Sequence, residues 1–191
     1  MSKIEVDEIV NQTGDNDSGI DLTTNDQIGF KIANASKWTL NSSGNLFPAS
    51  TAQGIVFGAT SDTASNRLDD YEEGTWTPSL NSSVSSNGNY TKIGRMVTLN
   101  GYIGSSDSST SSAVIVTGLP FAVADLVNNT SHEAQGTISY HENAGGNYAS
   151  AVVVRTGNEI DFRRSDTLTQ LQYADNSGTW SIRFSVTYFT S

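Results

Sequence analysis

The feature that most constrains the fold is a change of pattern at Leu68–Leu80, Leu-Asp-Asp-Tyr-Glu-Glu-Gly-Thr-Trp-Thr-Pro-Ser-Leu. Before this segment the chain is rich in Gly, Ser, Thr and Asn, and its apolar residues are scattered. After it, short stretches with alternating apolar and polar residues recur. The pattern predicts a thin N-terminal stalk followed by a compact C-terminal head.

Composition limits both the size of the core and the kind of partner. With 191 residues and 36% hydrophobic content, the chain can form one domain of roughly 100–150 residues plus an appendage. The formal net charge is -10, so phosphate backbones and anionic membrane surfaces are repelled, and nucleic acid is not an expected partner.

The chain has no cysteine, which excludes disulfides, thiolate metal sites and a cysteine nucleophile. Rigidity outside a cell would then come from oligomerisation. No apolar run is long enough for membrane insertion, and the first residues lack the apolar run of a signal peptide. If the protein acts outside a cell, we expect release by lysis or within a particle.

The N-terminal part divides into residues 1–10 and 11–67. Ile4 and Val6 alternate with Glu5 and Asp7, and Ile9 follows, which predicts a short anchor strand with one apolar face that it cannot bury alone. The strand therefore either docks on identical copies or anchors the chain in a larger particle. Residues 11–67 hold too little apolar surface for a monomeric core, so they are disordered or pair with identical copies around an axis. Their aromatic residues favour pairing.

Residues 68–74 form a predicted connector, and residues 75–191 a predicted β-sandwich head, most simply a jelly roll. The last strand is the clearest, because Trp180, Ile182, Phe184 and Val186 alternate with polar residues and are predicted to be buried. Gly104–Ser112 is predicted to be an exposed hairpin tip. The predicted strands are Thr75–Leu80, Asn89–Ile93, Arg95–Ile103, Ala113–Gly118, Ala134–His141, Tyr148–Thr156, Glu159–Arg163 and Thr179–Phe189.

No motif typical of catalysis is present. The carboxylates of residues 69–73 lie in a predicted turn, and Glu159 and Asp161 share an outer sheet face. A glycosidase needs two carboxylates facing each other across a substrate. The acidic run from Asp15 to Asp26 lacks the glycine and final glutamate of a calcium loop. We therefore expect no enzyme activity, no cofactor and no metal site.

Two loops of the head have a composition that suits ligand recognition. Aromatic rings stack on pyranose faces, amides and carboxylates bond hydroxyls, and arginine pairs with anionic polysaccharide. The alternative is that these loops only close hairpins. The candidate residues are Tyr140, His141, Asn143, Asn147 and Tyr148 in the first loop, and Arg163, Arg164, Asp166 and Tyr173 in the second.

Three phrases of the head are similar to those of a known family. They are Leu68-Asp-Asp-Tyr-Glu-Glu-Gly-Thr-Trp-Thr-Pro, Tyr90-Thr-Lys-Ile-Gly-Arg-Met-Val-Thr-Leu-Asn-Gly and Val116-Thr-Gly-Leu-Pro-Phe. They resemble the tail fibres and related short fibres of tailed bacteriophages, especially marine ones. The resemblance implies an all-β homotrimer with a head on a thin stalk, located on the exterior of a virion tail or capsid. It also implies attachment to tail or capsid proteins and contact with the host surface.

Three functions follow as hypotheses. The favoured one is a trimeric fibre whose knob binds host-surface glycan or protein and mediates adsorption, with multivalency strengthening weak contacts. The second is a fibre that decorates or assembles the capsid or tail without a host ligand. The third and least favoured is a glycan depolymerase.

Overall fold

The computed structural model describes residues 5–11, 17–51, 53–63, 66–126, 134–146, 148–155 and 157–190. Within these ranges the regular structure is antiparallel β-sheet, with no α-helix and a 3-10 turn at Tyr173–Asp175. The all-β prediction is confirmed. Among the described residues, no helix is long and apolar enough to cross a membrane. The chain divides into two compact units, Met1–Asp70 and Tyr71–Ser191, which are described separately here.

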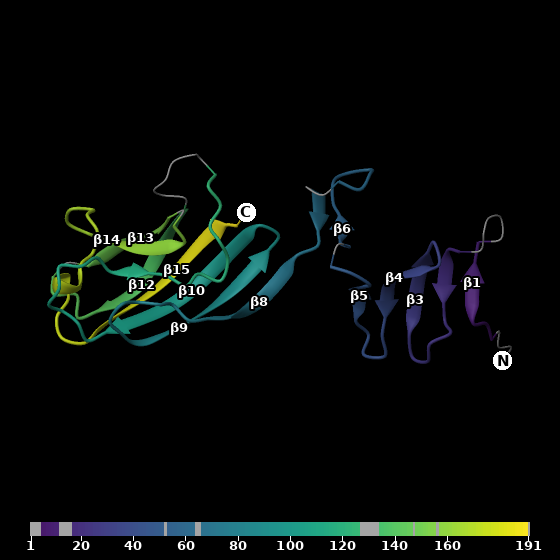
Figure 1. Ribbon diagram of the computed structural model, residues 1–191, viewed down its shortest axis with the longest axis horizontal. Helices are drawn as coiled ribbons and strands as arrows, with labels where there is room; N and C mark the ends of the chain where they lie inside the picture. Colours follow the sequence, from purple (N-terminus) through teal and green to yellow (C-terminus); the bar gives the residue numbers. More distant parts are fainter. Residues whose placement is uncertain are drawn as a thin grey trace. The chain divides into compact units, whose positions relative to one another are not determined.

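The N-terminal unit contains a five-stranded antiparallel meander in which each strand pairs with the next along the chain. Figure 1 shows these short strands side by side. Between the third and fourth strands, Ala33 and Asn34 both have positive φ, the conformation that a tight two-residue hairpin requires. A separate pair, β6 (Ile55–Val56) and β7 (Arg67–Leu68), completes the unit. The meander strands are β1 (Glu8–Val10), β2 (Gly19–Asp21), β3 (Ile28–Ile32), β4 (Ala35–Leu40) and β5 (Leu46–Pro48).

One face of the meander carries two rows of apolar residues, and the other is mixed, with charged and polar side chains beside Val10 and Phe47. Because directly paired residues point to the same side of a sheet, the register places five apolar residues in one row across all five strands. On the opposite face Lys31 forms an ion pair with Glu8. The row runs Ile9, Ile20, Phe30, Trp38 and Pro48, and Ile28, Leu40 and Leu46 form a second row on the same side.

This apolar face, defined by those two rows, has no cover within the unit. Phe30 remains 42% exposed, Ile9 55% and Leu46 57%. None of the buried hydrophobic residues of the described chain belongs to residues 5–70. Short strands that leave their apolar face in water are marginally stable at best, so a single copy of this unit lacks the packing that normally stabilises a sheet.

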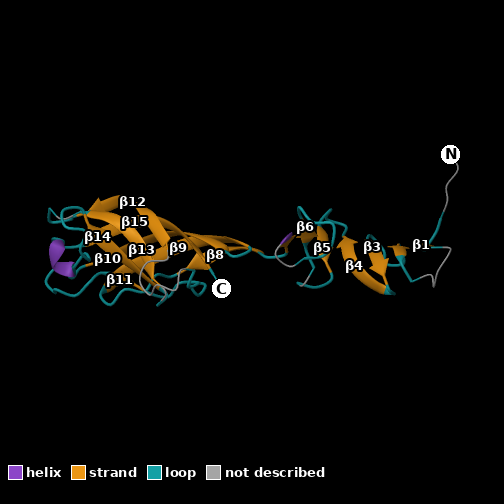
Figure 2. Ribbon diagram, turned by 90° about the horizontal axis from the view of Figure 1, so that it is seen from above, coloured by secondary structure: helices purple, strands orange, loops and turns teal. Residues whose placement is uncertain are grey.

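The C-terminal unit contains eight antiparallel strands in one hydrogen-bonded order, β11-β14-β13-β12-β15-β10-β9-β8. Figure 2 shows the long strands of this unit, which follow its length as a twisted group. Gly94, with φ of +56°, makes the tight turn between β9 and β10. The strands are β8 (Tyr71–Trp76), β9 (Ser83–Ile93), β10 (Met96–Ser105), β11 (Ile115–Val116), β12 (Ala134–Glu142), β13 (Ala149–Arg155), β14 (Glu159–Arg164) and β15 (Trp180–Phe189).

The two ends of this strand order meet. Ser79, just after β8, and Thr117, just after β11, exchange two backbone hydrogen bonds of 3.0 and 2.9 Å. A second isolated bridge joins Val123 to Thr190. The curled β layers therefore face each other around one core, an arrangement consistent with the predicted sandwich.

The core of the C-terminal unit contains the residues predicted from the last strand. Trp180 and Ile182 have no exposed surface, and Phe184 and Val186 are 3% and 2% exposed, so this prediction is confirmed. They pack with Val97, Leu99 and Ile103 of β10, Val114 and Val116 near β11, Ile160 and Phe162 of β14, and Leu171, Tyr173 and Tyr188.

Two glycines make room for aromatic rings in this core. Trp76 pairs with Gly88, Gly88 with Gly101, and Gly101 with Phe184, in one row across four strands. A Cβ atom on Gly88 would lie 2.2 Å from the Trp76 indole nitrogen, and one on Gly101 would lie 2.4 Å from the Phe184 ring. Glycine within a strand thus marks a close approach of a neighbouring group.

Three local predictions need correction. The first strand begins at Tyr71, so Glu72 and Glu73 lie in a strand that pairs with β9, not in a turn. β9 begins at Ser83, because backbone pairing with β10 extends a stretch that has weak strand propensity. Gly104 and Ser105 are buried within β10, so the predicted hairpin tip begins after them.

Candidate functional site

The outer face of β8, β9, β10 and β15 carries side chains whose chemistry changes in steps along the strands. Each step is a cross-strand row, set by the pairing register. An apolar row comes first, followed by a row of mainly threonines, a row of amides and hydroxyls, and a row that contains tyrosine and arginine. These rows are Tyr71–Ile93–Met96–Phe189, Glu73–Thr91–Thr98–Thr187, Thr75–Asn89–Asn100–Ser185 and Asn87–Tyr102–Arg183–Tyr140, the last reaching β12.

The amide and tyrosine–arginine rows border an open hollow of about 780 Å³. A second hollow of about 600 Å³ continues from it and shares three of its lining residues, Tyr102, Ser139 and Arg183. We call the two together the outer groove. The volume of each hollow lies in the range of sites that hold small ligands. Glycine backbone at positions 88 and 101 contributes to the lining of the groove.

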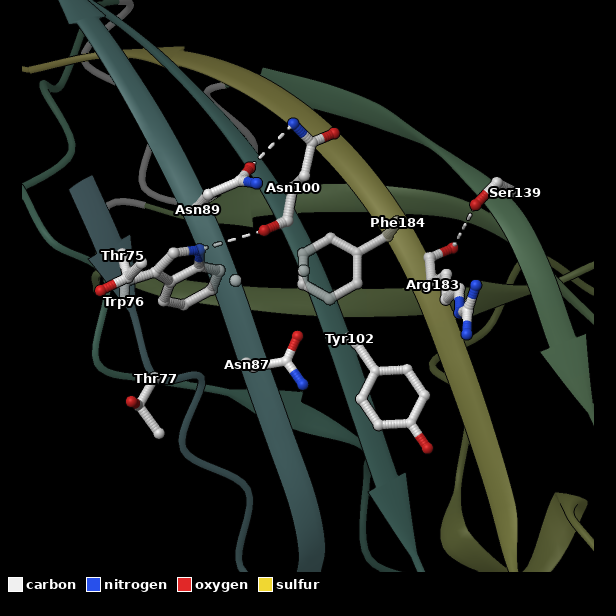
Figure 3. A pocket seen from close by; sticks show the side chains of 12 residues that line it. Thr75, Trp76, Thr77, Asn87, Asn89, Asn100, Tyr102, Ser139, Arg183 and Phe184 are labelled. Carbon is white, nitrogen blue, oxygen red and sulfur yellow. Dashed lines mark hydrogen bonds between the residues drawn. The ribbon is translucent and has the colours of Figure 1, made fainter. Parts of the chain in front are cut away.

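An amide pair borders one end of the outer groove. The Asn100 side chain donates a 3.2 Å hydrogen bond to the Asn89 side chain. The Trp76 indole N–H donates a 3.2 Å hydrogen bond to the backbone carbonyl of Asn100. Figure 3 shows both contacts, with Asn87 on the neighbouring part of the wall. Asn87, Asn89 and Asn100 are all exposed, so their amides present donors and acceptors to solvent.

An arginine between two tyrosines borders the other end. The Arg183 guanidinium lies 5.7 Å from the centre of the Tyr102 ring and 6.0 Å from that of Tyr140. Both contacts are within the range of cation–π interactions. Tyr140 is 49% exposed. At the same end, Glu142 accepts a 3.0 Å hydrogen bond from the Ser181 hydroxyl.

Of the first predicted loop, the structure places Tyr140 in the outer groove and His141 elsewhere. His141 accepts a 3.0 Å hydrogen bond from the Ala149 N–H at Nδ1, and its Nε2 lies 2.7 Å from the Asn176 side-chain oxygen. The ring also packs edge-on against Trp180. These contacts require neutral imidazole with the proton on Nε2. Burial lowers the pKa of His141 below its usual value.

The depressed pKa of His141 predicts a loss of stability in mild acid. Because the folded-state pKa lies below 6.5, the unfolded chain takes up the proton first as the pH falls. The stability that neutral His141 contributes above pH 6.5 is therefore lost as the pH drops from there through the folded-state pKa. We expect the melting temperature of the C-terminal unit to be a few degrees lower at pH 5.5 than at pH 7.5. In His141→Gln this pH dependence should shrink. An unchanged slope in His141→Gln would contradict the assignment.

The remaining residues of the first loop have structural contacts or are exposed. Asn143 adopts a φ of +55° and its side chain donates a 2.6 Å hydrogen bond to the Thr179 carbonyl. Tyr148 is 58% exposed, with its ring edge-on to His141. Asn147 lies outside the described residues, as does Ile4 of the predicted anchor. Val6 is exposed, and Ile9 belongs to the apolar face of the meander.

In the second predicted loop, the arginines pair with carboxylates of the chain itself. Arg163 contacts the fully buried Asp161 at 3.0 Å. Arg164 contacts Asp166 at 2.6 Å and Asp175 at 2.9 Å. The Arg164 side chain lowers the pKa of Asp166 to about 2. An anionic polysaccharide that binds these arginines would therefore have to compete with the aspartates that already pair with them.

Tyr173, the last candidate of that loop, is 2% exposed and packs edge-on against Trp180 in the core. Burial raises the pKa of its hydroxyl. A side chain with so little surface cannot stack on a ligand, so Tyr173 belongs to the core rather than to a binding loop.

The acidic pairs considered from the sequence are engaged with neighbours in the same way. Asp161 also lies 3.7 Å from Arg155 and accepts a 2.9 Å hydrogen bond from Gln170. Glu72 accepts a hydrogen bond from the Tyr90 hydroxyl, and Glu73 accepts one from Tyr71. No group of three or more His, Asp or Glu residues within the described ranges is arranged to hold a metal ion.

Comparisons with protein-family models, curated proteins and solved structures found no match to this chain. Sequence reasoning placed Arg183 on the outer face of the last strand but did not connect it with Tyr102 or the asparagines. The available signal was the alternation of β10, which puts Asn100 and Tyr102 on the face opposite Leu99 and Ile103.

Proposed function

We propose that this chain is a virion fibre protein of a tailed bacteriophage. It forms a homotrimer in which residues 1–70 make an intertwined stalk and residues 71–191 make a sandwich-like knob. The knob binds glycan or protein on the host surface and mediates adsorption. The stalk attaches the trimer to tail or capsid proteins on the exterior of the virion.

The observation that carries this proposal is the contrast between the two units. The C-terminal unit buries a core of its own, whereas the N-terminal unit has an amphipathic sheet whose apolar face is uncovered. Three copies that turn these faces towards a common axis would bury them together. The strongly acidic chain favours approach through this uncharged face, because charged surfaces of identical sign repel.

The position of Ile9 bears on the two predicted roles of the first strand. Ile9 pairs with Ile20 and continues the row that contains Phe30. Its side chain therefore shares the apolar face that the copies would cover. This supports docking on identical copies for Ile9 and leaves the segment before β1, including Val6, as the part that contacts other virion proteins.

Recognition by the knob is supported by the outer groove. It presents amides, hydroxyls, two tyrosines and an arginine on an open surface, and its wall comes from five strands. Such groups bond and stack on sugars. With three grooves per trimer, individually weak contacts add up to durable attachment, provided that the surface offers several ligands within reach.

Two measurements test the proposal. Light scattering should give a mass of about 61 kDa, three times the 20.4 kDa of one chain, and a monomeric mass would overturn the trimer. Purified protein, or an antibody against residues 71–191, should block phage adsorption to host cells. Full adsorption after loss of the protein from the particle would instead indicate a decorating fibre without a host ligand.

A further inference from the structure

We infer that the outer groove is specific for an acidic sugar, a pyranose that carries a carboxylate, within a surface polysaccharide. This inference rests on the proposed function and names its ligand class. The carboxylate would pair with the Arg183 guanidinium, and the sugar ring would lie against the exposed Tyr140. The amides at the other end of the groove would bond the hydroxyls of the next sugar.

Arg183 is the cation of the outer groove, which it shares with one carboxylate, that of Glu142. Within the described residues its side chain forms no ion pair and no hydrogen bond, and its guanidinium lies against the two tyrosine rings. Arg155, Arg163 and Arg164 of the same unit all pair with aspartates. A guanidinium presents paired N–H donors in a plane, which suits a carboxylate in two-point contact.

The two tyrosines orient the Arg183 guanidinium. The strand register sets Tyr102, Arg183 and Tyr140 side by side on β10, β15 and β12. Arginine loses conformational freedom when it binds, and a side chain already held over two rings loses less. The exposed Tyr140 ring lies beside the bound carboxylate, where it can cover the apolar face of a pyranose.

The charge of the chain restricts where an acidic sugar can bind. At a net charge of -10, the chain as a whole repels polyanions, so an acidic sugar binds only where a local cation offsets this repulsion. Glu142 is the other charged side chain that lines the groove, and its carboxylate accepts from Ser181. Glu142 and Asn87 are then acceptors for sugar hydroxyls, while Arg183 alone receives the carboxylate.

The test uses the full chain and defined oligosaccharides. Binding of a galacturonic acid trimer and of sialyllactose is measured by ligand-observed NMR, with a galactose trimer and lactose as the neutral counterparts. We expect at least one acidic probe to bind with millimolar affinity and at least tenfold more tightly than its neutral counterpart, a difference of the size expected for one charge-assisted contact.

The variants separate a specific site from general charge. Arg183→Gln should bind the acidic probe at least tenfold more weakly than the wild type. Arg183→Lys should show most of the same loss of affinity, because an ammonium cannot make the two-point contact of a guanidinium. Lys37→Gln removes the same charge in the N-terminal unit and should bind like the wild type. Arg183 is exposed and Lys37 is half-buried. Both variants are expected to leave the melting temperature unchanged, which shows that they are folded.

Several outcomes would overturn the inference. They are equal binding of acidic and neutral probes, no binding of any probe, and an Arg183→Gln variant that binds normally. A change of oligomeric mass in Arg183→Gln would show that this face contacts another copy instead. If the wild-type protein adsorbs to host cells and the Arg183→Gln protein adsorbs equally well, the inference about the acidic sugar fails, whereas the proposed function stands. If the wild type does not adsorb at all, the proposed function fails.

Discussion

Replacing Phe30 with aspartate is expected to convert a trimer of about 61 kDa into monomers of 20.4 kDa. Phe30 lies in the middle of the apolar face, paired with Ile20 on one side and Trp38 on the other. In a trimer, Phe30→Asp would bury three carboxylates near one axis. Burial of each unpaired charge costs several kcal/mol, and the three repel one another. Light scattering and sedimentation measure the change directly.

The matched control is Ser36→Asp in the neighbouring strand. Ser36 is exposed and pairs with Lys31 on the face opposite Phe30, so the same added charge should leave the trimer intact. In Phe30→Asp the C-terminal unit should stay folded, because its core contains no residue of the N-terminal unit. A Phe30→Asp variant that remains trimeric would show that the apolar face is not the surface between copies.

The last strand and the amphipathic pattern around it could be predicted because they depend on local alternation. Apolar residues of β15 alternate with Ser, Arg and Thr from Trp180 to Tyr188, so the buried apolar set follows from the sequence. Ser181, which is also buried, is the exception. The beginning of β9 could not be predicted in this way. Ser83–Asn89 has few β-branched residues and contains Gly88, which by itself indicates a turn. It is a strand because β10 supplies its hydrogen bonds and the Trp76 ring covers the glycine.

The candidate site shows the same limit more strongly. Its walls come from residues as far apart in sequence as Thr75 and Arg183, and only the cross-strand register brings them together. Loop composition drew attention to Tyr140, an aromatic residue beside polar groups, and the structure places this residue in the outer groove. Loop composition could not show that Arg164 has Asp175 as a partner, since Asp175 reaches it through the fold. The pair of Arg163 with Asp161 is local, because the two residues are two positions apart on one strand.

The glycine row predicts the largest effect on the stability of the C-terminal unit. Phe184→Ala should lower the free energy of unfolding by about 3–5 kcal/mol, because it removes a ring that packs edge-on against Phe162 at 5.3 Å and Trp76 at 6.5 Å. Gly101→Ala should cost about 1–3 kcal/mol, since its methyl group would press on that ring. Thr187→Ala, on the opposite face of β15, should cost less than about 1 kcal/mol.

The two large effects should not add. Without the Phe184 ring, the methyl group of Gly101→Ala enters vacated space, so the double variant should be at least as stable as Phe184→Ala alone. The cycle is measured by urea unfolding at one protein concentration. A Trp38→Phe background leaves Trp76 and Trp180, both in this unit, as the fluorescent reporters. Simple additivity would show that Gly101 and Phe184 do not share the space that the register assigns to them.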